Sequence, residues 1–133
     1  MKYFLDTDIC IYFLKGAFPG IKKRLMENKP GDIKIASVVK AELLFGAEKS
    51  QNAKKNRQRI ETFLSHFKVA PFGDNEAQIY AKIRTQLEKQ GSPIGGNDML
   101  IAATVIANEG TLVTNNEKEF RKVKGLKVQN WTV

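Results

Sequence analysis

The sequence predicts an α/β protein in which helices cover a mainly parallel central sheet. Short apolar runs of strand length alternate along the chain with longer segments in which apolar residues recur at helical spacing. The chain has 133 residues and an apolar fraction of 42%, which is enough for a buried core, and no Pro-, Gly- or Ser-rich linker divides it. Residues 1–133 are therefore expected to form one domain.

The N-terminal half is expected to contain two strands and four helices. The predicted elements are a strand at 2–5, helices at 9–14 and 18–28, a strand at 33–36, and helices at 38–49 and 53–67. Pro30 and Gly31 end the second helix, because both residues favour turns. Ser37 is expected to be the N-cap of the third helix, and the third and fourth helices are expected to form a hairpin.

The C-terminal half continues the alternation. The predicted elements are a strand or extended link at 68–72, a helix at 75–90, a loop at 92–97, a helix at 98–108, a strand at 111–114, a short helix at 117–123, and a final strand or extended end at 126–128. Gly91 ends the helix at 75–90. The helix at 98–108 is apolar almost all round, so we expect it to be buried.

The charge of the chain favours a polyanionic or strongly acidic partner. The formal net charge is +8, and such an excess attracts nucleic acids and acidic proteins. The basic residues form three clusters in predicted helices: Lys22, Lys23 and Arg24; Lys54, Lys55, Arg57 and Arg59; and Lys118, Arg121, Lys122 and Lys124. One such cluster is usually a solvated helix face. Three together favour nucleic-acid binding.

Two features bear on the cellular compartment. Cys10 is the only cysteine, so it cannot form an internal disulfide, and its apolar neighbours predict a small buried side chain. Asp6 and Asp8 interrupt the short apolar stretch at the N-terminus, and no later run approaches membrane-spanning length. We therefore expect a cytoplasmic protein that does not enter a membrane.

Two carboxylates follow the first predicted strand. Asp6 comes directly after it and Asp8 lies two residues further on. In open α/β sheets, ligands bind in the crevice outside the carboxyl ends of the strands, which makes Asp6 a candidate site residue. The alternative is structural, because Asp6, Thr7 or Asp8 can each cap the next helix.

Glu42 is notable for its place on a predicted helix. Positions 38, 41, 42 and 45 share one helical stripe, and Val38, Ala41 and Phe45 predict that this stripe is buried. A buried carboxylate needs a cation, a metal ion or a hydrogen-bond network. The alternatives are a salt bridge to a core Lys or Arg, or a small helix rotation that exposes Glu42.

The remaining candidates lie near the last helices. Asp98 opens the most apolar helix, where it is either an N-cap or a site residue. Thr114 and Asn116 follow the last clear strand, with Glu119 just beyond. Asn116 and Glu119 have the spacing of a capping box, which is the structural alternative to a role in the site.

A crevice shared by these carboxylates would be a metal site. Asp6, Glu42 and Asp98 repel one another and are stable together mainly when a hard cation such as Mg²⁺ or Mn²⁺ joins them. Such a cation binds phosphate oxygens and lowers the pKa of bound water, which is the chemistry of a nuclease. His66, the only histidine, is expected to be packed or at the surface rather than catalytic.

Four ordered segments resemble the PIN-domain family and, more narrowly, its VapC toxins. They are FLDTDICIYFLK at 4–15, SVVKAELLFGAEKS at 37–50, SPIGGNDMLIAA at 92–103 and LVTNNEKEF at 112–120. The resemblance spans nearly the whole chain. It implies a three-layer α/β/α sandwich, RNA cleavage dependent on Mg²⁺ or Mn²⁺, a homodimer, and neutralisation by a VapB-like antitoxin, through which alone operator DNA is bound.

The resemblance assigns the family's invariant acids to Asp6, Glu42 and Asp98, which would be the metal ligands. Thr114 is similar to the hydroxyl residue that supports the metal-bound water. Ser37 resembles a small hydroxyl residue that precedes the helix carrying the glutamate. Asp8 stands where many members have Asn.

The fourth acid of the family, often Asp, is Asn116 in this chain. The segment TNN-x-x-EF resembles a VapC subgroup in which Glu119 supplies the carboxylate and whose members cleave initiator tRNA in the anticodon loop. The resemblance therefore leaves Asn116 and Glu119 as alternatives for completing the site, and it names tRNA as the expected substrate.

Two other classes of function fit part of the sequence. Asp6-Thr7-Asp8 also resembles the D-x-D motif of phosphatases that form an aspartyl-phosphate, with Asp6 as nucleophile, but the Thr/Ser block and Lys motif of that family are missing. A non-catalytic nucleic-acid-binding regulator fits the charge and leaves Glu42 unexplained. For a toxin, a basic surface around an acidic crevice predicts an antitoxin tail with apolar anchors and an inserted Arg or Lys.

Overall fold

A computed structural model describes residues 1–133 and contains one five-stranded sheet. Its strands lie in the order β3-β2-β1-β4-β5. All four neighbouring pairs are parallel, so the sheet is wholly parallel where the sequence predicts a mainly parallel one. Parallel strands require a crossover between them, and here each crossover contains at least one helix.

The predicted elements are present with small shifts at their ends. The strands are β1 (Tyr3–Leu5), β2 (Ile33–Ala36), β3 (Lys68–Ala70), β4 (Thr111–Val113) and β5 (Lys127–Gln129). The helices are α1 (Thr7–Lys15), α2 (Pro19–Glu27), α3 (Ser37–Glu48), α4 (Ala53–Leu64), α5 (Asp74–Lys89), α6 (Gly96–Ala107) and α7 (Glu117–Phe120), with a short 3-10 turn at Pro30–Asp32. None of these helices combines the length and the apolar content that crossing a bilayer demands.

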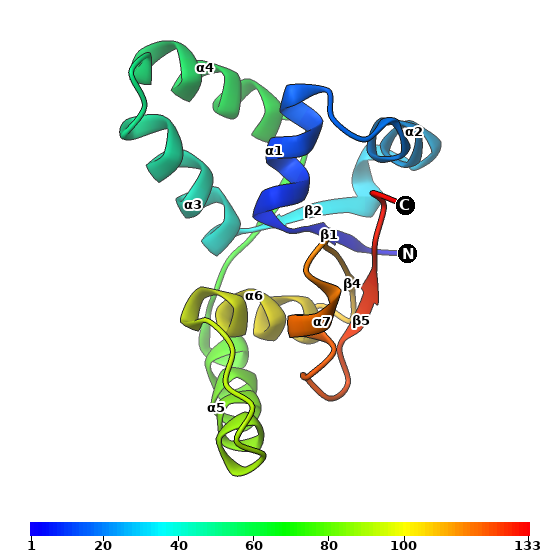
Figure 1. The fold of residues 1–133 in the computed structure, drawn as a ribbon, viewed down its shortest axis with the longest axis vertical. Helices are drawn as coiled ribbons and strands as arrows, with labels where there is room; N and C mark the ends of the chain where they lie inside the picture. Colours follow the sequence, from blue (N-terminus) through cyan, green and yellow to red (C-terminus); the bar gives the residue numbers. More distant parts are fainter.

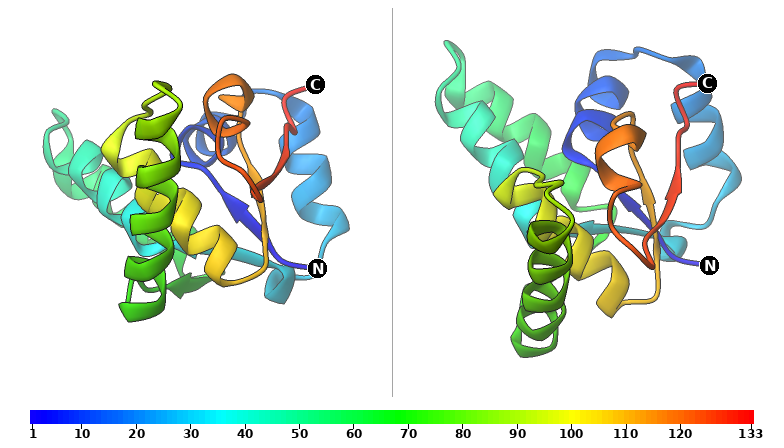
Figure 2. Two further views of the ribbon diagram at one scale, coloured as in Figure 1. Left: turned by 90° about the horizontal axis from the view of Figure 1, so that it is seen from below. Right: turned by 60° about the horizontal axis from the view of Figure 1, so that its bottom comes forward.

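The helices form two layers, one on each face of the sheet. Figure 1 shows α1 to α4 on one face and α5 and α6 on the other, with α7 beside α6. The same separation is visible from below, where α5 and α6 lie in front of the strands (Figure 2). The chain therefore folds as the α/β/α sandwich that the resemblance implies. Connections between parallel strands have the same hand. The chain moves in one direction across the sheet from β1 to β3, which places α1 to α4 on one face, and it then crosses back to β4, which places α5 and α6 on the opposite face.

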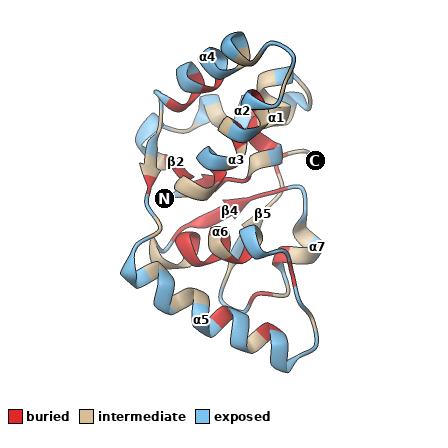
Figure 3. Cartoon of the chain, turned by 90° about the vertical axis from the view of Figure 1, so that its left-hand side faces the viewer, coloured by how far each residue is buried: buried red, intermediate tan, exposed pale blue.

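The core lies between the sheet and these layers. Phe4, Leu5 and Leu112 of the two central strands are almost fully buried, as the inner positions of a sheet covered on both faces must be. Helix α6 is buried along most of its length, as predicted, because it lies between the sheet and α5. Figure 3 shows this contrast, with buried residues concentrated in α6 and exposed ones along α5.

Two predictions about helix ends are wrong. Ser37 is the first helical residue of α3, and Ala36 occupies the N-cap position without a side-chain hydrogen bond. Strand β2 runs into α3 with no loop between them, so the cap position falls on the last strand residue. The predicted helix at 117–123 ends at Phe120, and residues 121–126 form turns that include Gly125 at a φ of 83°.

Gly110 is required by the close approach of β4 to β1. A Cβ atom added there would lie 2.7 Å from Cδ1 of Phe4, whose side chain is almost fully buried. Gly110→Ala is therefore expected to destabilise the fold by about 1–3 kcal/mol, since a packed ring has no room to move. Urea unfolding measures this change.

Gly31→Ala is the matched control, because no atom lies within 4 Å of a Cβ added at that position. Its effect on the free energy of unfolding is expected to stay within about 0.5 kcal/mol. Equal stabilities of the two variants would contradict the packing described here.

Candidate active site

The candidate site lies where the order of the strands reverses. The neighbours of β1 are β2 and β4, which the chain reaches by helices on opposite faces of the sheet. A crevice opens at such a switch point, outside the carboxyl ends of the strands. Asp6 follows β1 and Thr114 follows β4, and the backbone N–H of Asp6 donates to the carbonyl oxygen of Val113 at 2.9 Å. The register of the two strands therefore places Asp6 opposite Thr114.

Asp6 is a buried carboxylate held by two hydrogen bonds. Its side chain is 7% exposed. Oδ1 accepts from the backbone N–H of Thr7 at 2.8 Å, and Oδ2 accepts from the Thr114 hydroxyl at 2.7 Å. Asp6 is thus the N-cap of α1, which confirms the structural reading of the sequence, and this role is compatible with a place in the candidate site. Burial raises its pKa, as do the nearby charges of Asp8 and Glu42, while the two hydrogen bonds oppose the rise.

Thr114 is fully buried and connects the two strand ends. Its hydroxyl donates to Asp6 and accepts from the backbone N–H of Asn116 at 2.9 Å. The hydroxyl is therefore held in one orientation, and it fixes the Asp6 carboxylate in turn. A residue after β4 thus determines the position of a carboxylate 108 positions earlier in the chain.

Glu42 contacts residues of the candidate site, but the prediction that it lies on a buried helical stripe is wrong. The stripe of Val38, Ala41 and Phe45 is not the buried one, since Ala41 is exposed and Phe45 is 64% exposed. The buried face of α3 instead carries Val39, Leu43 and Ala47. Compared with the prediction, α3 is rotated about its axis, because α4 and the sheet cover the face with Val39, Leu43 and Ala47. Glu42 lies half-buried at the edge of this face.

Two side chains hold Glu42 at this edge. The Thr7 hydroxyl donates to its Oε1, and the Asn97 side-chain amide donates to its Oε2 at 3.4 Å. Thr7 adjoins Asp6 and Asn97 adjoins Asp98, so Glu42 lies between the two other acids. Sequence reasoning did not identify Thr7 or Asn97 as site residues. The sequence did hold a signal for them, since Thr7 lies between Asp6 and Asp8 and Asn97 directly precedes Asp98.

Asp98 lies in the first turn of α6 but is not its N-cap. Gly95 occupies the cap position, and Asp98 is three residues further on. The pKa of Asp98 is raised to about 6, mainly by burial and then by the charges of Asp6, Glu42, Glu119 and Asp8, in that order. The charges of Asp6 and Glu42 thus act on Asp98, which places the three predicted metal ligands at the same end of the molecule.

Asn116 and Glu119 are placed differently from each other. Asn116 is exposed and occupies the N-cap position of α7 without a side-chain hydrogen bond, so the predicted capping box does not form. Glu119 accepts from Nζ of Lys122 at 3.1 Å and contributes to the raised pKa of Asp98. Of the two, Glu119 is the one that adds negative charge to the crevice.

Helix N-termini partly offset this concentration of negative charge. Helices α1, α6 and α7 all begin near the carboxyl ends of β1 and β4. The partial positive charge at each N-terminus favours an anion nearby. The pKa values of Asp6 and Asp98 are nevertheless raised, mainly by burial and further by the neighbouring carboxylates.

The chemistry of these donors suits a hard divalent cation. Carboxylate oxygens are the ligands that Mg²⁺ and Mn²⁺ prefer, and the crevice contains no histidine or cysteine that would favour softer metals. No three acidic, histidine or cysteine side chains are already close enough to ligate one ion. Mg²⁺ usually keeps several waters and needs only one or two protein carboxylates. The residues present therefore fit such an ion.

Other residues singled out in the sequence lie away from the crevice. Cys10 is fully buried in the core, as predicted, and burial raises the pKa of its thiol. His66 is exposed and its Nδ1 lies 3.4 Å from the Phe63 carbonyl oxygen. Many members of the basic clusters are exposed, and several of them pair with glutamates, as Arg57 and Arg121 do.

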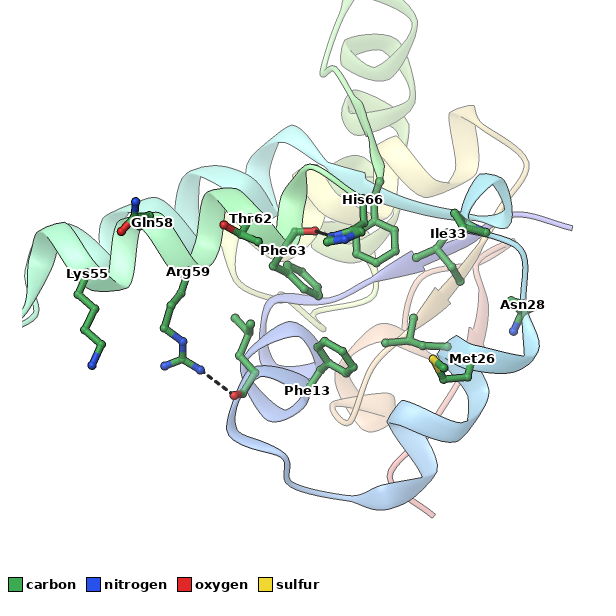
Figure 4. A pocket seen from close by; sticks show the side chains of 14 residues that line it. Phe13, Met26, Asn28, Ile33, Lys55, Gln58, Arg59, Thr62, Phe63 and His66 are labelled. Atoms are coloured by element: carbon green, nitrogen blue, oxygen red, sulfur yellow. Dashed lines mark hydrogen bonds between the residues drawn. The ribbon is translucent and has the colours of Figure 1, made fainter.

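The largest cavity is also separate from the acids. It is a groove of about 820 Å³ between α1, α2 and α4, and we call it the α1/α2/α4 groove. Phe13, Leu25, Met26 and Phe63 supply its apolar walls, and Figure 4 shows these walls with Lys55 and Arg59 along one edge. No carboxylate lines it, so it is suited to an apolar partner rather than to the chemistry of the crevice.

Comparison with known proteins gives one family over nearly the whole chain. Residues 3–126 match the PIN domain. The chain is 39% identical to "Ribonuclease VapC2" of Rickettsia felis, with 98% of each chain covered, and 37% identical to "tRNA(fMet)-specific endonuclease VapC" of Shigella flexneri, with 99% of each covered.

Solved structures give the same result. VapBC from Salmonella typhimurium bound to DNA matches with a TM-score of 0.93 at 32% identity, covering 98% of each chain. VapBC2 from Rickettsia felis bound to a promoter fragment matches with a TM-score of 0.91 at 38% identity, covering 98% of this chain and 99% of that one.

The raised pKa of Asp98 predicts a pH-dependent cost to the metal-free fold. Its folded-state pKa of about 6 exceeds the ordinary 3.8, so ionisation favours the unfolded state. The cost is absent below about pH 4, grows as the pH rises towards 6 and is complete above it. In EDTA, Asp98→Asn should therefore stabilise the protein at neutral pH and lose this advantage in acid. Because the side chain is half exposed, we expect on the order of 1 kcal/mol.

Urea unfolding at about pH 4 and pH 7.5 tests this prediction. Glu61→Gln is the control, since it removes an exposed carboxylate on α4 far from the crevice. A stabilisation by Asp98→Asn that is the same at both pH values would show that the charge cluster is not its cause.

Proposed function

Because the chain belongs to the PIN-domain family, and within it to the VapC ribonucleases, we propose that it is the RNA-cleaving toxin of a toxin–antitoxin pair. The observation that carries this proposal is the buried Asp6 carboxylate, fixed by Thr114 at the switch point of the sheet and surrounded by Glu42 and Asp98. We propose that residues 1–133 act as a single domain in the cytoplasm.

We propose Asp6, Glu42 and Asp98 as the ligands of a Mg²⁺ ion, with Mn²⁺ as a substitute. When bound, such an ion supplies an activated water and neutralises charge on the phosphate. The chain's own residues hold the ligands in place. Thr114 fixes the Asp6 carboxylate, and Thr7 and Asn97 fix Glu42 between the two aspartates. Hydrogen bonds of this kind to ligating carboxylates commonly tune metal affinity.

The fourth catalytic carboxylate is proposed to be Glu119, with Asn116 placed to contact substrate. The field of Glu119 reaches Asp98, whereas Asn116 brings no charge and is exposed at the start of α7. The Asn116 backbone N–H is already occupied by the Thr114 hydroxyl. Its side-chain amide remains available to hydrogen-bond a ribose or phosphate oxygen of the RNA.

The proposed substrate is tRNA, cut in the anticodon loop. The relative from Shigella flexneri is named a tRNA(fMet)-specific endonuclease. The net charge of +8 supports binding to a phosphate backbone. Exposed lysines that form no ion pair, such as Lys54 and Lys55 of α4, are the groups available for such contacts.

The proposed protein partners are a VapB-like antitoxin and a second copy of this chain. The solved structures that match are VapBC complexes, some of them bound to DNA, which supports contact with operator DNA through the antitoxin. The α1/α2/α4 groove offers apolar walls to an antitoxin helix (Figure 4). The candidate site offers carboxylates to an Arg or Lys at the tail of the antitoxin.

Cleavage of bacterial RNA tests the activity. Asp6→Asn, Glu42→Gln and Asp98→Asn should each reduce the rate of Mg²⁺-dependent cleavage at least about a hundredfold, since each removes a proposed metal ligand. EDTA should abolish cleavage by the wild-type protein. Sequencing of the new RNA ends identifies the substrate and the cut site.

Glu61→Gln is the matched control, because it neutralises an acid outside the crevice and should leave the rate unchanged. RNA that stays intact with the wild-type protein in Mg²⁺ and in Mn²⁺ would refute the nuclease proposal. Binding without cleavage would then favour a non-catalytic regulator.

Antitoxin binding tests the role of the groove. Met26 lines it and is 78% exposed, so Met26→Glu should leave the fold intact and weaken antitoxin binding at least about tenfold. Phe45→Glu is the control, since Phe45 is also exposed but lies on α3 outside the groove. Isothermal calorimetry with purified antitoxin gives both affinities. The proposal fails if Met26→Glu binds as tightly as the Phe45→Glu control.

A further inference from the structure

A second, smaller pocket opens beside the acidic crevice. It has a volume of about 270 Å³ and lies between α1, α3 and α4. We call it the α1/α3 pocket. Pockets for whole drug-sized ligands span roughly 300–1,000 Å³, so this one suits a single ring system.

The pocket shares one residue, Glu42, with the candidate site. Glu42 lines the pocket, and Thr7, which donates to Glu42, adjoins Asp6. From Glu42 the pocket extends along α3 to Gly46, one helical turn or about 6 Å away. A polymer whose phosphate lies at the carboxylates has a neighbouring unit within reach of this opening.

The walls of the pocket have the character of a base-binding site. Ile11, Leu43 and Ile60 supply apolar surfaces from three helices. Apolar side chains of this kind can cover both faces of a flat ring. Asn56 adds a polar edge, because its amide nitrogen donates to the Ser50 hydroxyl at 2.9 Å while its carbonyl oxygen accepts no hydrogen bond from the chain.

The rim of the pocket is basic. Lys15 and Arg59 both line it, and neither forms an ion pair. The Arg59 guanidinium donates to the Leu14 carbonyl oxygen at 2.9 Å, a contact that holds the group in place and leaves its charge uncompensated (Figure 4). Two positive charges beside an apolar slot, one of them held in place, complement a base that is flanked by phosphates.

We propose that the α1/α3 pocket binds one nucleobase of the RNA, next to the phosphate that is cut. This inference rests on the proposed nuclease function and adds a specificity site to it. Lys15 and Arg59 contact the flanking phosphates, and Ile11, Leu43 and Ile60 enclose the base. The α1/α2/α4 groove is three times as large and lacks any acid, so it remains the better fit for a protein helix.

Gly46 provides a direct test because it lines the pocket on a regular helix. Nothing lies within 4 Å of a Cβ added there, and its φ is not in the left-handed region. Gly46→Leu therefore fills the pocket without a backbone clash. Gly46→Ala is the matched control, since it makes the same gain in helix propensity and adds only one methyl group.

The experiment compares two RNAs after the cut site has been mapped with the wild-type protein. One is the intact anticodon stem-loop of initiator tRNA, and the other has an abasic nucleotide next to the cut. Affinity is measured by fluorescence anisotropy in EDTA. The rate of cleavage is measured separately, under single-turnover conditions in Mg²⁺. Gly46→Leu is expected to weaken binding of intact RNA about tenfold or more, as the loss of one enclosed base would. Gly46→Ala should remain within about twofold of the wild type.

The abasic RNA identifies what the pocket holds. It should bind the wild-type protein as weakly as intact RNA binds Gly46→Leu, and combining both changes should add nothing further. Additive losses, or full RNA binding and cleavage by Gly46→Leu, would overturn the proposal while leaving the nuclease function intact. Loss of antitoxin binding alone by Gly46→Leu would assign the pocket to the antitoxin. If no RNA is cleaved by the wild-type protein, the nuclease proposal fails, and the anisotropy of the intact stem-loop with Gly46→Leu and Gly46→Ala in EDTA still tests whether the pocket contributes to RNA binding.

Discussion

The structure depends on one constraint, a carboxylate that is buried at the junction of two central strands. Asp6 can occupy this position because the Thr114 hydroxyl and the Thr7 backbone N–H satisfy its oxygens. The register of β1 against β4 brings those partners together, and the switch in strand order opens space in front of them. Burying a charge in this way is costly even with good hydrogen bonds. A cation bound at this position would offset the cost.

The other acids increase that cost rather than relieve it. Glu42 and Asp98 lie in different helix layers of the sandwich. The charge of Glu42 raises the pKa of Asp6, and the charge of Asp6 raises the pKa of Asp98. Helix N-termini supply only partial compensation. A site of this kind is less stable empty than filled, which is the usual relation between stability and activity at catalytic centres. Metal binding would remove the repulsion and would release a proton from Asp98 at mildly acidic pH.

The two cavities divide the surface around α1 between two kinds of partner. Leu14 and Arg59 line both of them and separate the broad apolar α1/α2/α4 groove from the smaller α1/α3 pocket. The groove has no acid and suits a helix of another protein. The pocket shares Glu42 with the proposed catalytic site and would suit a part of the proposed substrate. A protein bound in the groove would therefore contact Leu14 and Arg59, which also line the pocket proposed to bind RNA. Such contacts could explain how a bound partner inhibits the protein.

The sequence by itself determined the layered fold and the order of the elements, and it singled out Asp6, Glu42 and Asp98 as the acids of a candidate site. The fold follows from local information, since periodicity sets helix or strand, and Asp6 follows from its place directly after a strand. The tertiary structure decided the rest. It turned α3 so that Phe45 is exposed and Glu42 lies at the edge of the crevice, made Gly95 rather than Asp98 the cap of α6, and joined Thr7 and Asn97 to Glu42. It also created the α1/α3 pocket from three helices. Such features depend on how separate elements pack against one another, and a pattern within one segment carries no record of its neighbours.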